Sequence, residues 1–147
     1  MTHVRKRMRD YFDTVLLANV PLAKRRVFPT RIFPLDGGKL PCLAVYTTSE
    51  ASALQTMGRK TLARDVSIVV EAYIRASDTF DDDADAISVQ IESAVSADTT
   101  LGGLAKDTVL ISTEIEFSSE AERPIGVARL TFTVRYVTSI EDASTAR

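Results

Sequence analysis

The stretch from Thr61 to Ala76 alternates apolar and polar residues over most of its length, and this alternation constrains the fold more than any other feature of the sequence. A period of two residues places alternate side chains on opposite faces of a β-strand. The expected buried face is interrupted by one charged residue, Arg64. We therefore predict one long, half-buried strand. Its apolar face carries Leu62, Val66, Ile68, Val70, Ala72 and Ile74, and its other face carries Asp65, Ser67, Val69, Glu71, Tyr73 and Arg75.

Two further alternating runs lie closer to the C-terminus, and we expect them to pair as an antiparallel hairpin. Residues 118–124 between the runs supply the turn. The first run alternates Val109, Ile111, Ile115 and Phe117 with Leu110, Ser112, Glu114 and Glu116, and the second alternates Leu130, Phe132, Val134 and Tyr136 with Arg129, Thr131, Thr133 and Arg135.

The stretch from Arg26 to Thr48 predicts another β-hairpin, around which the rest of the chain would be organised. Its β-prone runs are residues 27–33 and 40–46, and the Asp-Gly-Gly sequence at 36–38 supplies the positive φ angles that a reversal needs. Pro29 and Pro34 cannot donate hydrogen bonds to a sheet, so the first run should lie at a sheet edge. The second run is the better candidate for a core strand.

Two segments show the apolar spacing of three and four residues that is typical of amphipathic helices. The first spans residues 3–18 and should end before Pro21, because the residue before a proline avoids the α region. The second is capped by Ser77 or Thr79, carries aspartates in its first turns, and runs to about Ala97. The apolar stripes are Val4, Met8, Tyr11, Phe12, Val15 and Leu16 in the first helix, and Phe80, Ala84, Ile87, Ile91, Ala94 and Val95 in the second.

These segments together predict an α+β fold. Residues 49–60 have no clean period, and we expect a long loop there; the Leu-Gly-Gly-Leu sequence at 101–104 should form a turn. The order is α-β-β-β-α-β-β, with two helices packed on one face of a mostly antiparallel sheet of about five strands. The length of 147 residues fits one domain over residues 1–138, followed by a small, polar and flexible tail over residues 139–147.

The formal net charge of -2 hides an uneven distribution. Residues 1–31 contain eight basic residues against Asp10 and Asp13, whereas residues 71–123 contain thirteen acidic residues against three basic ones. A basic patch on one copy could meet an acidic patch on the next, and such head-to-tail contacts can close into a ring. The alternative is that both regions are simply solvated faces.

Few residues suggest chemistry, and we predict no catalytic, cofactor-binding or metal site. The single histidine, His3, lies in the N-terminal region, where we expect the chain to fray, so neither a Ser/His/Asp triad nor a histidine-rich metal site can be built. Cys42 lies in an apolar strand, where a buried thiol is expected. The aspartates at 81–85 lack the glycine and glutamate of an EF-hand loop. The basic groups at 5–9 and 24–26 lack an aromatic stacking platform, so a specific nucleic-acid partner is not expected. Neither a signal peptide nor a membrane span is visible.

The order and spacing of several short segments resemble the tail terminator family of long-tailed phages, also called minor tail protein U-like, with relatives in prophages and gene transfer agents. The resemblance covers residues 3–138. It comprises the N-terminal helix, Val27-Phe28 with Arg31, the run from Leu40-Pro41 to Val45-Tyr46-Thr47, the strand from Leu62 to Ile74, the sequence DTTLGGL at 98–104, and the closing strand LTFTVRY at 130–136.

This resemblance implies a virion protein without catalysis that assembles in the host cytoplasm as a ring, expected to be a hexamer. The ring would cap the head-proximal end of the tail tube, stop the addition of major tail protein, and present a surface to head-completion proteins. Our own interpretation places the loop at 49–60 against the tube or a neighbouring subunit, although a mobile solvent loop is the alternative. The candidate interface residues are Gln55, Met57, Arg59, Lys60, Arg31, Asp82 and Asp83.

Other classes of function stay open from the sequence. A head-completion or neck connector would share the ring but bind the portal side. A small ligand-binding or enzymatic α+β domain would need a concave pocket with convergent polar groups. A nucleic-acid module would show a strongly salt-dependent affinity for DNA.

Overall fold

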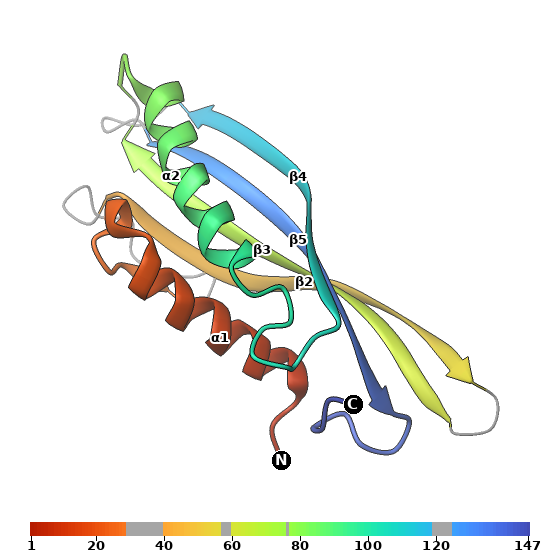
Figure 1. Cartoon of the computed structure of the whole chain (residues 1–147). Coiled ribbons are helices and arrows are strands. Elements are labelled where there is room, and N and C mark those ends of the chain that lie inside the picture. Colours follow the sequence, from red (N-terminus) through yellow and green to blue (C-terminus); the bar gives the residue numbers. More distant parts are fainter. Residues whose placement is uncertain (29–39, 57–59, 76, 119–124) are drawn as a thin grey trace.

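The computed structural model describes residues 1–28, 40–56, 60–75, 77–118 and 125–147. Two helices cover one face of a five-stranded sheet, as Figure 1 shows, and the fold is α+β as predicted. The strands lie in the order β1-β2-β3-β5-β4. The elements are α1 (Val4–Asn19), the short 3-10 helix η1 (Pro21–Ala23), β1 (Val27–Phe28), β2 (Cys42–Thr56), β3 (Thr61–Arg75), α2 (Phe80–Ser96), β4 (Asp107–Ser118) and β5 (Ile125–Ser139).

The helix α1 forms where the apolar stripe predicts it. Its buried side chains recur every four residues, at Val4, Met8, Phe12 and Leu16. The N-cap is His3, whose Nδ1 accepts a hydrogen bond from the Arg5 N–H at 3.1 Å. This gives the histidine a structural role that the sequence did not suggest, because it satisfies one of the free N–H groups of the first turn.

The helix α2 also matches its predicted stripe, with Phe80, Ala84, Ile87 and Ile91 among its buried residues. The capping of this helix differs from the prediction. Thr79 occupies the N-cap position, but its hydroxyl donates to the Asp83 carboxylate at 3.1 Å and caps no backbone N–H group of the helix. The aspartates of the first turn therefore carry the favourable interaction with the helix dipole.

The centre of the sheet is the antiparallel pair of β3 and β5, which are in register from Thr61↔Ser139 to Arg75↔Ile125. The predicted apolar face of β3 lies against the helices, with Val66, Ile68 and Val70 fully buried. Phe132 of β5 packs edge-on against Phe12 of α1, with ring centroids 5.7 Å apart. The helix stripes and the strand alternation thus meet in one core, as the patterns predict.

The predicted hairpin at residues 26–48 is wrong in its pairing. The strand β1 contains only Val27 and Phe28, and it pairs with Leu43 and Ala44 of β2 in parallel. A two-residue reversal joins antiparallel strands, whereas a parallel pair needs a connection of about a dozen residues or more, which residues 29–41 provide. The expected turn at residues 36–38 lies outside the described residues.

The predicted loop at residues 49–60 is also wrong. Most of this stretch belongs to β2, which continues to Thr56 and pairs with β3 almost to its start at Thr61. Residues 51–55 are exposed and the stretch is rich in small residues, so its own propensity for a strand is weak. The long template offered by β3 overrides that propensity, and the pair extends beyond the helices (Figure 1).

The C-terminal residues 139–147, for which we predict a flexible tail, lie against the rest of the domain. The strand β5 includes Ser139, and the chain then turns back towards the start of α1. The Val4 N–H donates to the Ala143 carbonyl at 3.0 Å, and the Arg147 N–H donates to the Val137 carbonyl at 2.8 Å. The segment thereby satisfies a free N–H group of the first turn of α1.

Candidate functional site

The end of the β2–β3 pair carries two of the predicted interface residues. Gln55 is exposed, and its side-chain oxygen accepts a hydrogen bond from the Thr61 hydroxyl at 3.3 Å. Lys60 is also exposed and has a φ of 47°. Its carbonyl accepts a hydrogen bond from the Ile140 N–H at 2.9 Å, which ties the backbone at this end to the C-terminal segment. We call residues 50–56 and 60–65 the hairpin end.

Two further predicted residues, Asp82 and Asp83, lie at the opposite end of the sheet. Both are exposed in the first turn of α2, which follows the last residue of β3, Arg75. Because β3 runs from the hairpin end towards α2, the structure separates Lys60 from the aspartates by the length of that strand. The other three predicted residues, Arg31, Met57 and Arg59, lie outside the described residues.

The basic N-terminal region is divided between the two ends of the molecule. Arg5 and Lys6 belong to the first turns of α1, close to the C-terminal segment. Lys24 and Arg25 follow η1 and lead into β1, at the end of the sheet where α2 begins. The structure therefore separates the two signs of charge less cleanly than the sequence suggests.

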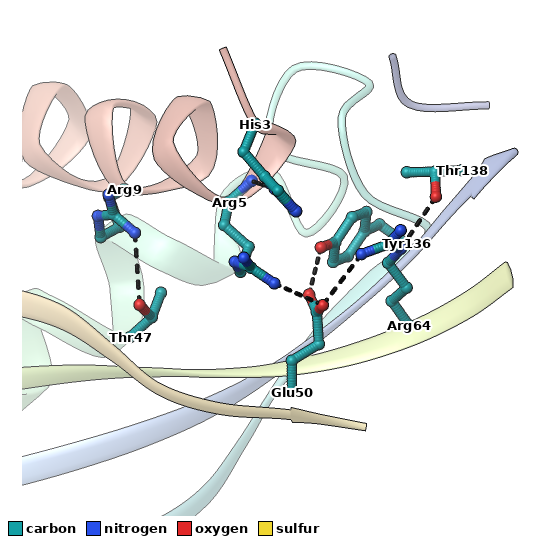
Figure 2. A network of polar contacts seen from close by, with 8 residues as sticks. All are labelled: His3, Arg5, Arg9, Thr47, Glu50, Arg64, Tyr136 and Thr138. Carbon is teal, nitrogen blue, oxygen red and sulfur yellow. Dashed lines mark hydrogen bonds and ion pairs between the residues drawn. The ribbon is translucent and has the colours of Figure 1, made fainter. Parts of the chain in front are cut away.

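A buried ion cluster joins α1 to the hairpin end, and Figure 2 shows it from close by. At its centre is the Glu50 carboxylate, whose side chain is 10% exposed. Arg5 donates to it at 2.7 Å and Arg64 at 3.2 Å, while the Tyr136 hydroxyl donates to its second oxygen. The Arg64 guanidinium also donates to the Thr138 hydroxyl at 2.9 Å. The cluster therefore connects α1, β2, β3 and β5.

The charged residue that interrupts the apolar face of β3 is thus explained. Arg64 is buried on that face because Glu50 supplies a counter-charge there, and burial of an unpaired guanidinium would be costly. The position of Arg64 on an otherwise apolar strand face is the sequence signal that could have predicted a buried acidic partner such as Glu50. Burial and the hydrogen bond to Glu50 raise the pKa of Tyr136, so its hydroxyl stays protonated as a donor. Burial lowers the pKa of His3, with the Arg5 charge adding to the effect.

A second cluster lies on the helix-free face of the sheet, around Glu71. The Tyr73 hydroxyl donates to its carboxylate at 2.7 Å, the Tyr46 hydroxyl donates to the other oxygen, and Arg129 lies 3.6 Å away. Arg129 also pairs with Glu114 at 3.2 Å and with a second β4 carboxylate. Burial and the hydrogen bond to Glu71 raise the pKa of Tyr73. This cluster ties the four long strands together across that face.

The strand β4 has the most unusual surface of the molecule. It forms one edge of the sheet, and every described side chain from residue 111 to residue 117 is exposed. Four of its apolar side chains remain about half exposed: Val109 at 50%, Ile111 at 56%, Ile115 at 45% and Phe117 at 59%. The predicted pairing with β5 is confirmed, but β4 places few of its apolar residues in the core.

A cavity of about 350 Å³ lies where η1, the start of β2, the end of β3 and α2 meet. Its wall is mainly apolar, and Arg75, Ser77 and Asp83 also line it. Cys42, which begins β2, is buried as predicted, and burial raises the pKa of its thiol to about 11. The thiol is therefore protonated at neutral pH and acts as a small apolar side chain.

Comparison with known proteins adds no assignment. No protein-family model and no curated protein matches the chain. Within the described ranges, no group of three or more His, Cys, Asp or Glu residues is arranged to hold a metal ion. None of the described helices is both long and apolar enough to span a membrane.

Proposed function

We propose that this protein is a non-enzymatic assembly protein whose copies close into a ring. The observation that carries the proposal is the exposed edge of the sheet at β4, where a long strand presents apolar side chains and no basic residue. Soluble proteins normally protect such an edge with charged side chains, proline, a bulge or a covering element, because it can pair with another chain. The strand β4 has a bulge at Ile111 and exposed carboxylates at Glu114 and Glu116, but residues 112–118 still form an uninterrupted ladder whose outer edge no described element covers. An edge left open in this way suits a protein that functions in an assembly.

The resemblance to tail terminators suggests where such a ring acts, and we include that location in the proposal. The ring, expected to be a hexamer, caps the head-proximal end of a phage tail tube, stops further addition of major tail protein and presents a joining surface to a head-completion protein. In this proposal the hairpin end faces the tube, since it projects beyond the helices and its residues Gln55 and Lys60 are exposed. The acidic first turn of α2, with Asp82 and Asp83, then faces away from it.

The proposal is tested by polymerising the cognate major tail protein with and without this protein and examining the tubes by negative-stain microscopy. We expect tubes that stop at a defined length and carry a ring at one end. Tubes that grow without limit and carry no ring would overturn the assignment to tail termination.

A matched pair of charge reversals sharpens this experiment. Lys60→Glu changes the hairpin end, whereas Lys24→Glu makes the same change at the opposite end of the sheet. If the hairpin end docks on the tube, Lys60→Glu lowers the fraction of capped tubes several-fold and Lys24→Glu leaves it unchanged. Equal effects of the two variants would contradict the proposed orientation.

Two other functions have different tests. A neck connector would bind isolated portal complexes and ignore isolated tubes, which the same microscopy distinguishes. A ligand-binding domain has one observation in its favour, the cavity of about 350 Å³ lined by apolar residues together with Arg75 and Asp83. Saturable binding of a small amphipathic ligand, lost in Ala86→Trp at the cavity wall, would support that second candidate.

A further inference from the structure

We propose that the copies meet by strand pairing: the outer edge of β4 on one copy adds to residues 50–56 of β2 on the next, and the sheet continues from copy to copy. This inference deepens the proposed ring by naming its contact, and it does not depend on the identity of the tube. The occupant of the β4 edge is thus a second copy of this chain.

The described residues leave both edges of the sheet open. On one side, β4 pairs only with β5, and a bulge at Ile111 interrupts that pairing once, so that residues 112–118 form a regular ladder. On the other side, β1 covers only Leu43 and Ala44 of β2. From Glu50 to Thr56, β2 pairs with β3, and no other described strand pairs with that part of it.

The directions of the strands fit this contact. The pairs β2–β3, β3–β5 and β5–β4 are all antiparallel, so β4 of one copy would run antiparallel to β2 of the next. The alternation of strand directions then continues across the boundary. Such a contact joins two different surfaces and can close into a ring, whereas pairing of β4 with itself would stop at a two-fold dimer.

The side chains and the position of β1 also fit. Ala51, Ser52 and Ala53 of β2 are small and exposed, which leaves room beside the larger apolar side chains of β4, and Leu54 adds a 61% exposed apolar partner. Because β1 occupies the edge at Ala44, the incoming β4 must pair further towards the hairpin end. That displacement staggers neighbouring copies along the strands, and strands in a closed sheet tilt and stagger in this way.

Cross-linking of designed cysteines tests the contact. Ser52→Cys and Thr113→Cys place one thiol on each exposed edge, on the same face of the sheet, while Cys42 is buried. A short bis-maleimide should convert the double variant into a ladder of covalent multimers on a denaturing gel, and each single variant should stay monomeric. Dimers formed by Thr113→Cys alone would overturn the proposal in favour of a two-fold contact, and absence of the ladder at millimolar protein would overturn it outright.

A matched pair of surface variants gives an independent readout. Ile111→Lys places a charge on the edge, and Val89→Lys makes a similar change on α2, where the valine is 62% exposed. With the fold verified by circular dichroism, we expect Ile111→Lys to weaken self-association in sedimentation at least tenfold and Val89→Lys to leave it unchanged.

The failure of the strand contact and the failure of the proposed function can be told apart. Cross-linked multimers without tube capping would refute tail termination alone, whereas capped tubes without cross-linked multimers would refute the strand contact alone.

Discussion

Gly126 in β5 has to be a glycine because the Phe80 ring occupies the space beside it. A Cβ atom at this position would lie 2.0 Å from the ring, far inside van der Waals contact. Phe80 is itself 5% exposed at the start of α2, so it cannot move into solvent without losing its packing.

We predict that Gly126→Ala lowers the free energy of unfolding by about 1–3 kcal/mol, the usual cost of overpacking a core. Urea denaturation measures the change. The same substitution should cost much less when Phe80 is first replaced by alanine. Additive effects of the two substitutions would show that the ring is not the cause.

Asp13 on α1 opposes folding at neutral pH. Burial, with the Asp10 charge adding to it, raises the pKa of Asp13 from an ordinary 3.8 to about 6, and its Oδ1 atom has no hydrogen-bond partner among the described residues. Because the folded-state pKa exceeds the unfolded one, the folded protein is destabilised progressively as the pH rises from about 4 through 6.

We therefore predict that Asp13→Asn stabilises the protein above pH 7 by about 1 kcal/mol, a value reduced from the full pKa shift because the side chain is half-buried. The gain should shrink to a small fraction of this value at pH 4, where the folded-state carboxyl is protonated and the unfolded one, with its ordinary pKa of 3.8, is close to half protonated. Thermal unfolding at pH 4 and pH 8 checks this, and an equal gain at both values would contradict it.

Glu50 should contribute far more to stability than an exposed acidic residue, because its partners Arg5 and Arg64 are held against a largely buried carboxylate. We predict that Glu50→Gln lowers the free energy of unfolding by about 3 kcal/mol, since it leaves Arg64 buried without a counter-charge.

The matched control for Glu50→Gln is Asp65→Asn. Asp65 pairs with Arg135 at 2.9 Å, but both side chains are well exposed. The control should cost less than about 1 kcal/mol. Similar losses in the two variants, measured by chemical denaturation, would mean that burial of the Glu50 cluster does not determine its contribution.

At the scale of elements, the C-terminal segment acts as part of the α1 docking site. Ala146 packs against the core, and the Ala143 carbonyl accepts from the first residue of α1. We predict that deletion of residues 140–147 lowers the melting temperature by several degrees, as expected for the loss of about 1 kcal/mol in a chain of this size.

Hydrogen exchange locates the effect of that deletion. Amides in the first turn of α1 should exchange faster in the shortened chain, because the deletion removes the Ala143 carbonyl that accepts the Val4 N–H. Amides in the centre of β3 and β5 should keep their protection. Unchanged exchange in that turn would show that the segment contributes nothing to helix docking.

At the scale of the whole molecule, the open strand edges and the charged ends lie on different sides of the domain. The edges lie on the sides of the sheet, whereas Lys60 and Asp82 lie at opposite ends of the strands. In the proposed assembly, the edges close the ring and the charged ends meet what lies above and below it. The two kinds of contact should therefore respond differently to salt.

We predict that raising the salt concentration from about 50 mM to about 500 mM lowers tube capping more than it lowers ring formation, because screening acts on exposed charges and hardly on strand pairing. Sedimentation reports the ring, and microscopy reports the capped tubes. Equal loss of both would contradict the separation of the two contacts.

The sequence by itself determined the elements whose pattern repeats over many residues. The alternation in β3 and β5 and the stripes of α1 and α2 are each long enough to specify one secondary structure and one buried face, and they predict the α+β fold with both helices on one side. They do so because burial of a continuous apolar face is the largest favourable term in folding.

Only the tertiary structure decided what depends on partners distant in the chain. The parallel pairing of β1, the extension of β2 to Thr56 and the burial of Arg64 against Glu50 all follow from neighbours that local sequence does not reveal. The exposure of Ile111 and Phe117 has the same origin, because alternation in β4 predicts a strand but cannot show that the strand lies at the edge of the sheet, where Phe117 contacts the first residue of α2, Phe80, and is otherwise exposed.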